Sequence, residues 1–542
     1  MICQEQGKNY IIDGQQRLTS LTLLLIYLHT IQQEPETAIA AKRDVRPLIF
    51  SEMFGEKSFN LDVPERIPAI EALYSGNPFD PIGQPESVQT IVARYKDIVE
   101  YFPDSLKDQA LPYFIDWLTY NVHLVEITAY SDDDAYTIFE TMNDRGLSLS
   151  PTDMLKGYLL ANIDDLHKPA ANVLWKQRTL ELAEFGKEED ADFIKAWLRA
   201  KYARTIREGK KDAKPQDFEK ISSSFNKWAK DEKALLSLNT KADFLAFINE
   251  RFARFSRHYL HLREAALSQT PGLEHIFYNA YNNFTLQYPL MLAPVRTEDD
   301  LETVSRKIRL VAVYIDIFVA RRIWNFRTLG YSAIVRTMFN LMRDIRDLSV
   351  QELADLLRER VEKMDETFAS DTRFRLHQQN RYQVHYLLAR ITSHIEAQSG
   401  IESSFATYTD RSIKKPFEIE HIWADNFDRH KDEFSNPWEF GEYRNHIGGL
   451  VLLQRGFNQS LGGATYPTKL KHYYGQNLLA RSLHGQCYEN NPAFNAYRKQ
   501  SKLPFMPHAE FKKEDLDTRQ DLYRQIAKEI WGPQALTTAL QS

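Results

Sequence analysis

Cysteine is nearly absent from this chain of 542 residues, which contains only Cys3 and Cys487. Two cysteines exclude a disulfide framework and a cysteine-rich zinc ribbon, and such low use suits a reducing compartment. Long hydrophobic runs are also lacking, because the most apolar stretch, residues 21–28, is far too short to span a bilayer and has no signal-peptide cleavage site beside it. The sequence therefore predicts a cytoplasmic protein without a membrane partner.

An excess of positive charge is lacking too, since 68 Lys plus Arg face 74 Asp plus Glu and give a net charge of -6. This balance offers little general support for a nucleic-acid partner, because phosphate binding draws on clustered Lys and Arg. The charge is, however, unevenly distributed along the chain. Residues 411–510 hold 13 Lys plus Arg against 10 Asp plus Glu, so this C-terminal block is slightly basic.

Apolar and aromatic residues are plentiful, at 43% and 12%, and the length predicts two to four domains. Helical periodicity dominates from about residue 165 to 395, where a repeat of apolar residues from Phe244 to Leu262 predicts a long amphipathic helix. The short polar stretch 398–409 is the best linker candidate. Elsewhere we expect strands at 9–12 and 122–128 and helices at 16–31, 132–142, 151–160 and 515–531.

Three short motifs near the C-terminus suggest the chemistry. Glu420-His421 pairs a carboxylate with an imidazole, Asn445-His446 precedes an apolar strand, and Asn458 follows that strand. An imidazole can take a proton from water while a divalent cation, held by oxygens, neutralises charge developing on a phosphodiester. This order indicates the two strands and helix of an HNH nuclease. We expect His421 to be the general base, Glu420 and Asn458 to be metal ligands, and Asn445 and His446 to be further catalytic residues.

Since cysteine pairs are lacking, the site is expected to use Mg²⁺ or Mn²⁺ rather than a structural zinc. This block resembles HNH nucleases, and the resemblance implies an asparagine where the sequence has Gly449, so Asn445 or His446 is expected to take over that role. Lys469 and His472 are separated by one helical step, a pattern more typical of a solvated helix face. A contact between Lys469 and phosphate is the alternative.

A second candidate site lies at the strand-to-helix turn formed by Asp13, Gly14, Gln15, Gln16 and Arg17. Glycine lets a ligand approach the backbone, the start of a helix offers unpaired N–H groups, and an arginine adds a cation for phosphate. Asp13 could hold a metal ion or a ribose hydroxyl. The competing interpretation is an ordinary Asp-Gly turn with Arg17 in a salt bridge.

Residues 13–19, together with 138–146 and 149–156, resemble the N-terminal domain of GmrSD-type modification-dependent restriction endonucleases, which is ParB/sulfiredoxin-like. Residues 418–474 are similar to the HNH domain that this family carries at its C-terminus. The resemblance implies that the N-terminal domain binds and hydrolyses a nucleoside triphosphate, often while sensing modified DNA, and that the HNH domain cuts the DNA. It assigns the nucleotide site to Asp13, Gly14, Gln15, Gln16 and Arg17. Asn143, Asp144 and Arg145 are secondary candidates for the same pocket, and the alternative is that they only connect two helices.

The chain departs from this family at its start. Members usually carry a further segment ahead of the Asp-Gly motif, whereas here Met1 lies only 12 residues before Asp13. Either the start is misplaced, or the chain is a shortened homologue whose N-terminal domain is structural and lacks triphosphatase activity.

Taken together, the sequence predicts a mainly helical α+β protein with a ParB-like domain at 1–165, a helical domain at 166–397 and a ββα-metal HNH domain at 410–542. The expected function is nucleotide-regulated, metal-dependent cleavage of DNA, including modified DNA, in a prokaryotic restriction or phage-defence system, with ATP, GTP or another nucleotide as effector. The alternatives are a regulator whose HNH fold binds DNA without cutting it, and an RNA-directed nuclease, because such a site reads backbone phosphates. A homo-oligomer is compatible with the sequence.

Overall fold

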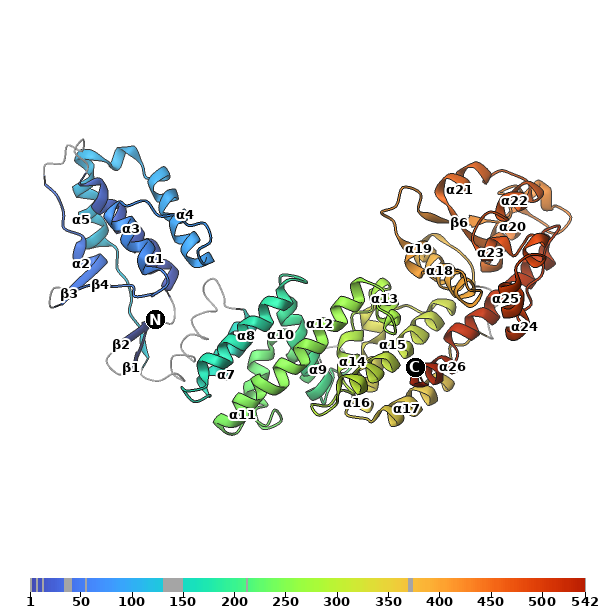
Figure 1. The fold of residues 1–542 in the computed structure, drawn as a ribbon, viewed down its shortest axis with the longest axis horizontal. Coiled ribbons are helices and arrows are strands. Elements are labelled where there is room, and N and C mark those ends of the chain that lie inside the picture. The colour runs from blue at the N-terminus through green and yellow to red at the C-terminus, as the bar shows by residue number, and fades with distance from the viewer. Residues whose placement is uncertain are drawn as a thin grey trace. The chain divides into compact units, whose positions relative to one another are not determined.

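A computed structural model describes residues 2–5, 8–11, 14–33, 41–53, 56–129, 150–210, 213–368 and 374–541 (Figure 1). It divides into two compact units, Met1–Ser150 and Pro151–Ser542. Helices dominate the described part of the chain and the strands in it are few and short, which confirms the predicted helical α+β class.

The first unit is built around one apolar helix, α1 (Gln15–Ile31), whose buried side chains include Leu23, Ile26 and Leu28. Its range confirms the helix predicted at 16–31. Strands β1 (Ile2–Glu5) and β2 (Lys8–Ile11) precede it and pair in antiparallel fashion, and β5 (Thr128–Ala129), much later in the chain, pairs with β1 in parallel fashion. The remaining α-helices and strands of this unit are α2 (Arg46–Ile49), β3 (Phe50–Met53), β4 (Glu56–Phe59), α3 (Ile67–Ser75), α4 (Glu86–Tyr101) and α5 (Leu111–Asn121).

The strand predicted at 122–128 is wrong in extent, because residues 122–127 have no regular structure and only Thr128 enters β5. Val122, Leu124 and Val125 are exposed, so this apolar run is not packed in a sheet. The helix predicted at 132–142 lies outside the described residues.

The second unit begins with a stack of helices, and the predicted amphipathic helix buries its apolar face in this stack. Phe244, Ile248, Phe252, Phe255 and Tyr259 are all buried there, as the apolar repeat predicts. The helix contains one wider π-helical turn, η3 (Phe247–Phe252). This turn joins α11 (Lys241–Ala246) to α12 (Ala253–Leu267). The other helices of the stack are α7 (Pro151–Ala161), α8 (Lys168–Ala183), α9 (Glu189–Tyr202), α10 (Asp217–Asp231), α13 (Glu274–Tyr281), α14 (Gln287–Leu292), α15 (Leu301–Trp324), α16 (Tyr331–Asp344) and α17 (Val350–Glu362).

The C-terminal helices pack back onto this stack. Helix α25 (Lys513–Trp531), which confirms the helix predicted at 515–531, contacts both α15 and α18 (Arg381–Gln398), and α26 (Gln534–Gln541) contacts α15 and α17. One buried hydrophobic cluster extends from Leu155 to Ala539. The structure therefore groups residues 166–397 and 410–542 in a single compact unit, although the sequence predicts them as separate domains.

The stretch 398–409 is not a linker, and this prediction is wrong. Its second half forms helix α19 (Phe405–Thr409), in which Phe405 and Tyr408 are buried. The Tyr408 hydroxyl also donates a hydrogen bond to buried Glu396 on α18 at 2.5 Å. Aromatic side chains thus anchor a segment whose polar composition suggests an exposed connection.

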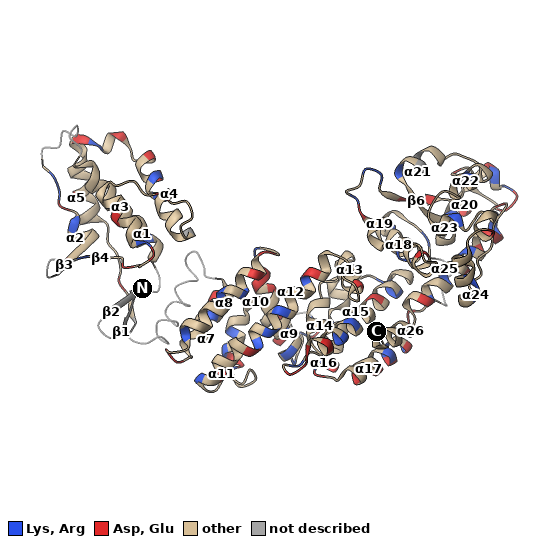
Figure 2. Ribbon diagram, in the orientation of Figure 1, with Lys and Arg blue, Asp and Glu red and all other residues tan. Residues whose placement is uncertain are grey.

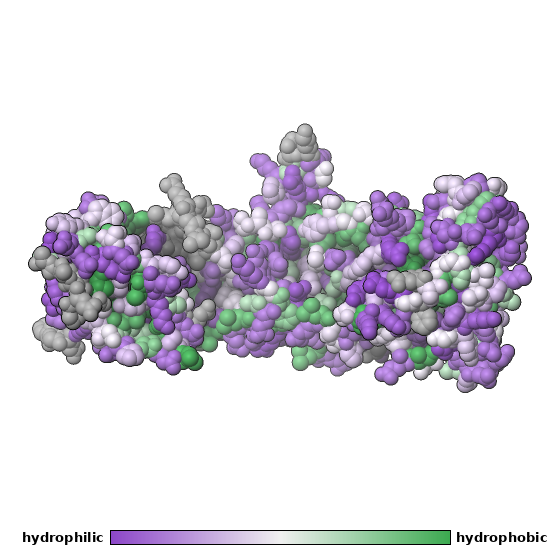
Figure 3. Space-filling view, turned by 90° about the horizontal axis from the view of Figure 1, so that it is seen from above, coloured by the Kyte–Doolittle hydropathy of each residue, from purple (hydrophilic) through white to green (hydrophobic). Residues whose placement is uncertain are grey.

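Charged residues of both signs are interleaved along the helices rather than gathered on separate elements (Figure 2). On the face drawn in Figure 3, hydrophilic residues predominate and hydrophobic ones are scattered between them. None of the described helices is long and apolar enough to cross a membrane.

Among the described residues of the second unit, His258, His385, His430 and His508 are buried, and the pKa of the first two is strongly shifted. Burial lowers the pKa of His258 and of His385 to about 4, with a further lowering contribution from Arg254 for His258. His385 on α18 donates from Nε2 to the carbonyl oxygen of Phe417 at 3.0 Å. The folded protein thus holds both rings neutral at a pH where an unfolded chain would protonate them, so this contribution to stability is present above pH 6.5 and is lost as the pH falls from 6.5 towards 4.

Lowering the pH from 7.5 to 5 is expected to reduce the free energy of unfolding of the second unit by roughly 2 kcal/mol for each of these two histidines. His385→Gln retains a donor for the Phe417 carbonyl but cannot titrate, so its loss over this range should be smaller by about that amount. Urea unfolding at several pH values measures the difference. The exposed His123→Gln is the control, and an equal pH dependence for His385→Gln and His123→Gln would contradict the expectation.

Candidate active site

A two-stranded hairpin positions the C-terminal candidate residues. Strand β6 (Phe417–His421) pairs in antiparallel fashion with β7 (Leu450–Gln454), and His421 lies opposite Leu450. Leu450, Val451, Leu452 and Leu453 are completely buried, so the hairpin is held by the core on both faces. Helix α21 (Arg455–Leu461) follows β7 directly, which gives the strand–strand–helix order that the sequence predicts.

His421 is half-buried and its ring is oriented by Asn445. The Asn445 side-chain amide donates to the Gly441 carbonyl at 2.8 Å, which turns its Oδ1 towards His421 Nε2, also at 2.8 Å. The Nε2–H group therefore donates to Asn445, and Nδ1 carries the lone pair. Among the described residues, Nδ1 of His421 has no hydrogen-bond partner.

The electrostatic surroundings keep this imidazole neutral. Burial, followed by the positive charge of Arg444, lowers the pKa of His421 to about 4, and Lys469 and Arg381 act in the same direction. Arg444 is itself fixed by a hydrogen bond from Nε to the Trp423 carbonyl at 3.0 Å. A neutral, oriented ring with an available lone pair is what a general base requires.

Asn445 is placed by the end of helix α20 (Pro437–Arg444) and by a short segment ahead of α18. Its carbonyl accepts a hydrogen bond from the Leu376 N–H at 2.7 Å, and the Ile447 N–H donates to the Phe374 carbonyl at 3.3 Å. His446 packs its ring against Tyr443, with 4.5 Å between the ring centroids. Of the two candidates for the missing asparagine role, the structure brings Asn445 into contact with His421.

Glu420 and His421 project to opposite faces of β6, because neighbouring residues in a strand alternate. The Glu420 carboxylate is 4% exposed, and its Oε1 accepts a hydrogen bond from Lys469 Nζ at 2.5 Å. Lys469, on helix α22 (Tyr466–Tyr473) and 1% exposed, also donates to the His421 carbonyl at 2.7 Å. The interpretation of Lys469 as part of a solvated face is therefore wrong.

Burial dominates the titration of this ion pair. It raises the pKa of Glu420, against the opposing effect of the Lys469 charge, and lowers the pKa of Lys469, against the effect of Glu420. Lys469 and Glu420 are 49 residues apart, so no local sequence pattern indicates that they form an ion pair.

Gly449 has a steric explanation. A Cβ atom at this position would lie 3.0 Å from Cδ1 of Leu516 on α25 and 3.3 Å from the Arg444 carbonyl oxygen. The neighbouring Gly448 is closer still, since its Cβ would lie 2.4 Å from the Gln520 backbone nitrogen. The Gly448 N–H donates to Oε1 of Gln520 at 2.7 Å. Helix α25 thus occupies the space that an asparagine side chain would need.

Of the two predicted metal ligands, the structure describes the side chain of Glu420 but not that of Asn458. Asn458 lies in α21, and its side chain is outside the described part of the structure. Among the described residues, no three His, Cys, Asp or Glu side chains form a group that could hold a metal ion. Oxygen ligands such as Glu420 suit Mg²⁺ or Mn²⁺. Because Lys469 pairs with Glu420, an ion at that carboxylate would compete with the lysine, so the described residues do not by themselves form a metal site.

The N-terminal candidates surround the start of α1. Gly14 is the N-cap residue with φ of 95°, a left-handed conformation that glycine adopts readily. The Gln15 side chain turns back and donates to the Ile11 carbonyl at 3.0 Å, while Gln16 and Arg17 lie in the first turn. Asp13 and the secondary candidates Asn143, Asp144 and Arg145 lie outside the described residues.

Comparison with known protein families defines the class as restriction endonuclease. Residues 1–160 match the GmrSD restriction endonuclease N-terminal domain, and residues 361–526 match the GmrSD restriction endonuclease C-terminal domain. The chain belongs to the GmrSD restriction endonuclease family. No curated protein matches it in sequence. The C-terminal match begins ahead of α18, which agrees with the contacts that residues 374–376 make with the hairpin.

The buried ion pair leads to a stability prediction. Lys469→Met leaves the Glu420 carboxylate buried without its cation, so the free energy of unfolding of the second unit should fall by about 3–5 kcal/mol. Replacing both partners, as Glu420→Gln with Lys469→Met, removes the uncompensated charge and should recover most of the loss. Urea unfolding measures both variants.

Lys471→Met is the matched control, because Lys471 is an exposed lysine on the same helix. Its effect should stay within about 0.5 kcal/mol. A Lys469→Met protein as stable as this control would show that the pair contributes nothing.

Proposed function

We propose that the hairpin block hydrolyses DNA phosphodiester bonds with His421 as the general base. The supporting observation is the neutral His421 ring, whose Nε2 is oriented by Asn445 and whose Nδ1 has no partner among the described residues. In this proposal Nδ1 takes a proton from water, the water oxygen bonds to phosphorus, and the bond from phosphorus to one ester oxygen breaks. Asn445 acts by holding the ring.

We propose Mg²⁺ or Mn²⁺ as the required ion, with Glu420 and Asn458 as ligands. When bound, such an ion neutralises charge on the phosphate and on the leaving oxygen. Glu420 is available as a ligand only if it shares its carboxylate with the ion or releases Lys469. The dependence of cleavage on added metal ion, and its loss with a chelator, tests this part of the proposal.

His421→Ala is expected to lower the rate of DNA cleavage by about 10² to 10⁴-fold, because no other described group presents a neutral imidazole next to the Asn445 side chain. Nicking of plasmid DNA in Mg²⁺ or Mn²⁺ is the measurement. His472→Ala is the matched control, since His472 is an exposed histidine of the same block. Cleavage by His421→Ala at the rate of the control would rule out His421 as the base.

A second candidate function is binding of DNA without cleavage, by a regulator with a degenerate HNH fold. Two observations favour it: glycine replaces the asparagine at 449, and Lys469 occupies one oxygen of Glu420. DNA binding that persists with no nicking in either metal ion would support this function. The same assay with RNA separates the third possibility, an RNA-directed nuclease.

We further propose that a nucleoside triphosphate binds at the start of α1 and licenses cleavage of DNA, including modified DNA. The left-handed Gly14 and the basic Arg17 at the N-terminus of a 17-residue helix support this proposal, because helix N-termini favour phosphate. ATP, GTP or another nucleotide could serve. We also propose that the chain forms a homo-oligomer.

Arg17→Ala is expected to weaken nucleotide binding by about tenfold or more, since a charged hydrogen bond to phosphate is lost. Phosphate release from ATP and from GTP, with unmodified, glucosylated and phosphorothioated DNA, measures the effect. Arg94→Ala is the control, because Arg94 lies exposed on α4. Equal phosphate release from both variants would place the nucleotide elsewhere.

A further inference from the structure

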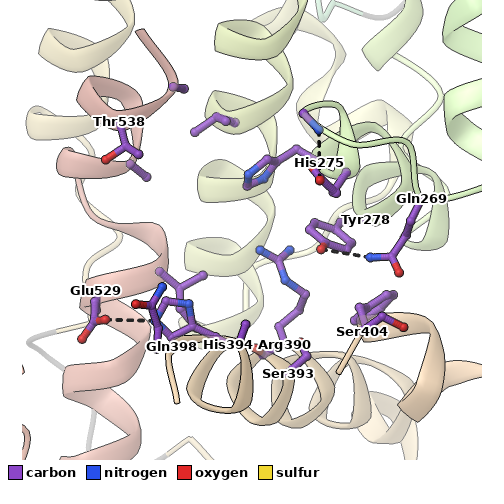
Figure 4. A pocket seen from close by; sticks show the side chains of 18 of the residues that line it. Gln269, His275, Tyr278, Arg390, Ser393, His394, Gln398, Ser404, Glu529 and Thr538 are labelled. Atoms are coloured by element: carbon purple, nitrogen blue, oxygen red, sulfur yellow. Dashed lines mark hydrogen bonds and ion pairs between the residues drawn. The ribbon is translucent and has the colours of Figure 1, made fainter. Parts of the chain in front are cut away.

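A cavity of about 960 Å³ lies in the second unit, away from the hairpin residues His421 and Asn445. Helices α13, α15, α18, α25 and α26 contribute its lining (Figure 4). Its volume is that of a site for a nucleotide-sized molecule. Polar side chains from several helices converge on it, with Val313, Phe405 and Ile530 as apolar parts of the lining.

Arg390 is the central polar group of this lining. It is 5% exposed, and its Nη1 donates to Oδ1 of buried Asp316 at 2.9 Å. The guanidinium also stacks on Tyr278, 3.6 Å from the ring centroid. Figure 4 shows the guanidinium rising from α18 between Tyr278 and His275.

The other edge of this guanidinium is unused. Neither Nε nor Nη2 of Arg390 has a hydrogen-bond partner among the described residues. Neither atom is completely buried, so a bound molecule can reach both. These two nitrogens form the side of the fork that binds two oxygens of a carboxylate or phosphate in parallel. A side chain so deeply buried, and held rigidly from behind by Asp316, presents a preorganised pair of donors.

Two histidines line the same cavity, each held through one ring nitrogen. His275 Nδ1 bonds Asp316 at 2.9 Å, and His394 Nε2 bonds Glu529 at 3.0 Å (Figure 4). The second ring nitrogen of each has no partner among the described residues. The second nitrogen of each ring can therefore form a hydrogen bond with a bound molecule.

The acidic groups of the lining are already engaged. Glu529 accepts hydrogen bonds from His394 and from the Tyr497 hydroxyl, at 3.1 Å for the latter, and Glu274 accepts one from the Gly272 N–H at 3.0 Å. Asp316, which is not part of the lining but pairs with Arg390 and His275, accepts hydrogen bonds at both of its oxygens. Each of these carboxylates thus has donors, whereas Nε and Nη2 of Arg390 have no acceptor among the described residues.

We propose that this cavity binds a small molecule through an oxyanion, either a carboxylate or a phosphate, held by Nε and Nη2 of Arg390. His275 and His394 assist from the two sides. The site is separate from the proposed nuclease chemistry and from the proposed nucleotide site at Gly14 to Arg17.

Isothermal titration of the full chain with matched probes tests this proposal. The pairs are AMP against adenosine and glutarate against glutaramide, so that each pair differs in the anionic group. We expect the anionic member of at least one pair to bind and its neutral partner to bind much more weakly. Binding of AMP alone identifies phosphate as the ligand group, and binding of glutarate alone identifies a carboxylate.

Two variants locate the binding. Arg390→Lys keeps the charge opposite Asp316 but loses the fork, and it should weaken binding at least about tenfold. Ser393→Phe places a ring in the cavity beside Arg390 without altering the Asp316 contacts, and it should have the same effect. Arg381→Lys, an exposed arginine at the start of the same helix, is the control.

Thermal melting shows whether each variant is folded, and Ser393→Phe keeps the test valid if Arg390→Lys unfolds. The proposal is overturned if no anionic probe binds at millimolar concentration. It is also overturned if binding persists unchanged in Ser393→Phe, since the probe would then occupy another site, such as that near Gly14.

Discussion

Complete burial of the Asp316 carboxylate is the constraint on which the second unit depends. An ionised carboxylate without water is costly unless donors surround it. Here four donors do so: His275 from α13, Tyr386 and Arg390 from α18 and Trp531 from α25, at 2.6–3.1 Å. Burial raises the pKa of Asp316, but the Arg390 charge and the hydrogen bonds from His275 and Tyr386 outweigh it and hold that pKa far below its usual range. Three helices distant in sequence are thereby fixed to α15.

Two of those helices, α18 and α25, support the hairpin of the candidate active site. Helix α18 holds the start of β6 through His385 and the Phe417 carbonyl, and α25 lies against Gly448 and Gly449 at the start of β7. The hairpin is therefore set by the helical core rather than standing as a separate module. This arrangement explains how His421 and Asn445 keep their 2.8 Å contact at the edge of a sheet of only two strands.

Local motifs were predictable from the sequence, and distant contacts were not. Helix α1, helix α25, and the strand–strand–helix order around His421 follow from periodicity, capping residues and motif order over short stretches. The Glu420–Lys469 pair and the packing of α25 on Gly448 join residues 49 and 72 positions apart, and no local pattern reports such contacts. The predictions of a strand at 122–128 and of a linker at 398–409 are wrong for the same reason, since contacts with residues distant in sequence determine the structure of these stretches.

The close approach of α25 to Gly448 also has a consequence for the order of assembly. The hairpin strands are synthesised well before Gln520 and Leu516, so β7 emerges from the ribosome without the helix that covers its first residues. The environment of Gly448 and Gly449 is completed only when α25 docks. Completion of the hairpin therefore depends on α25. In nascent chains, or in chains truncated before α25, the start of β7 is left uncovered.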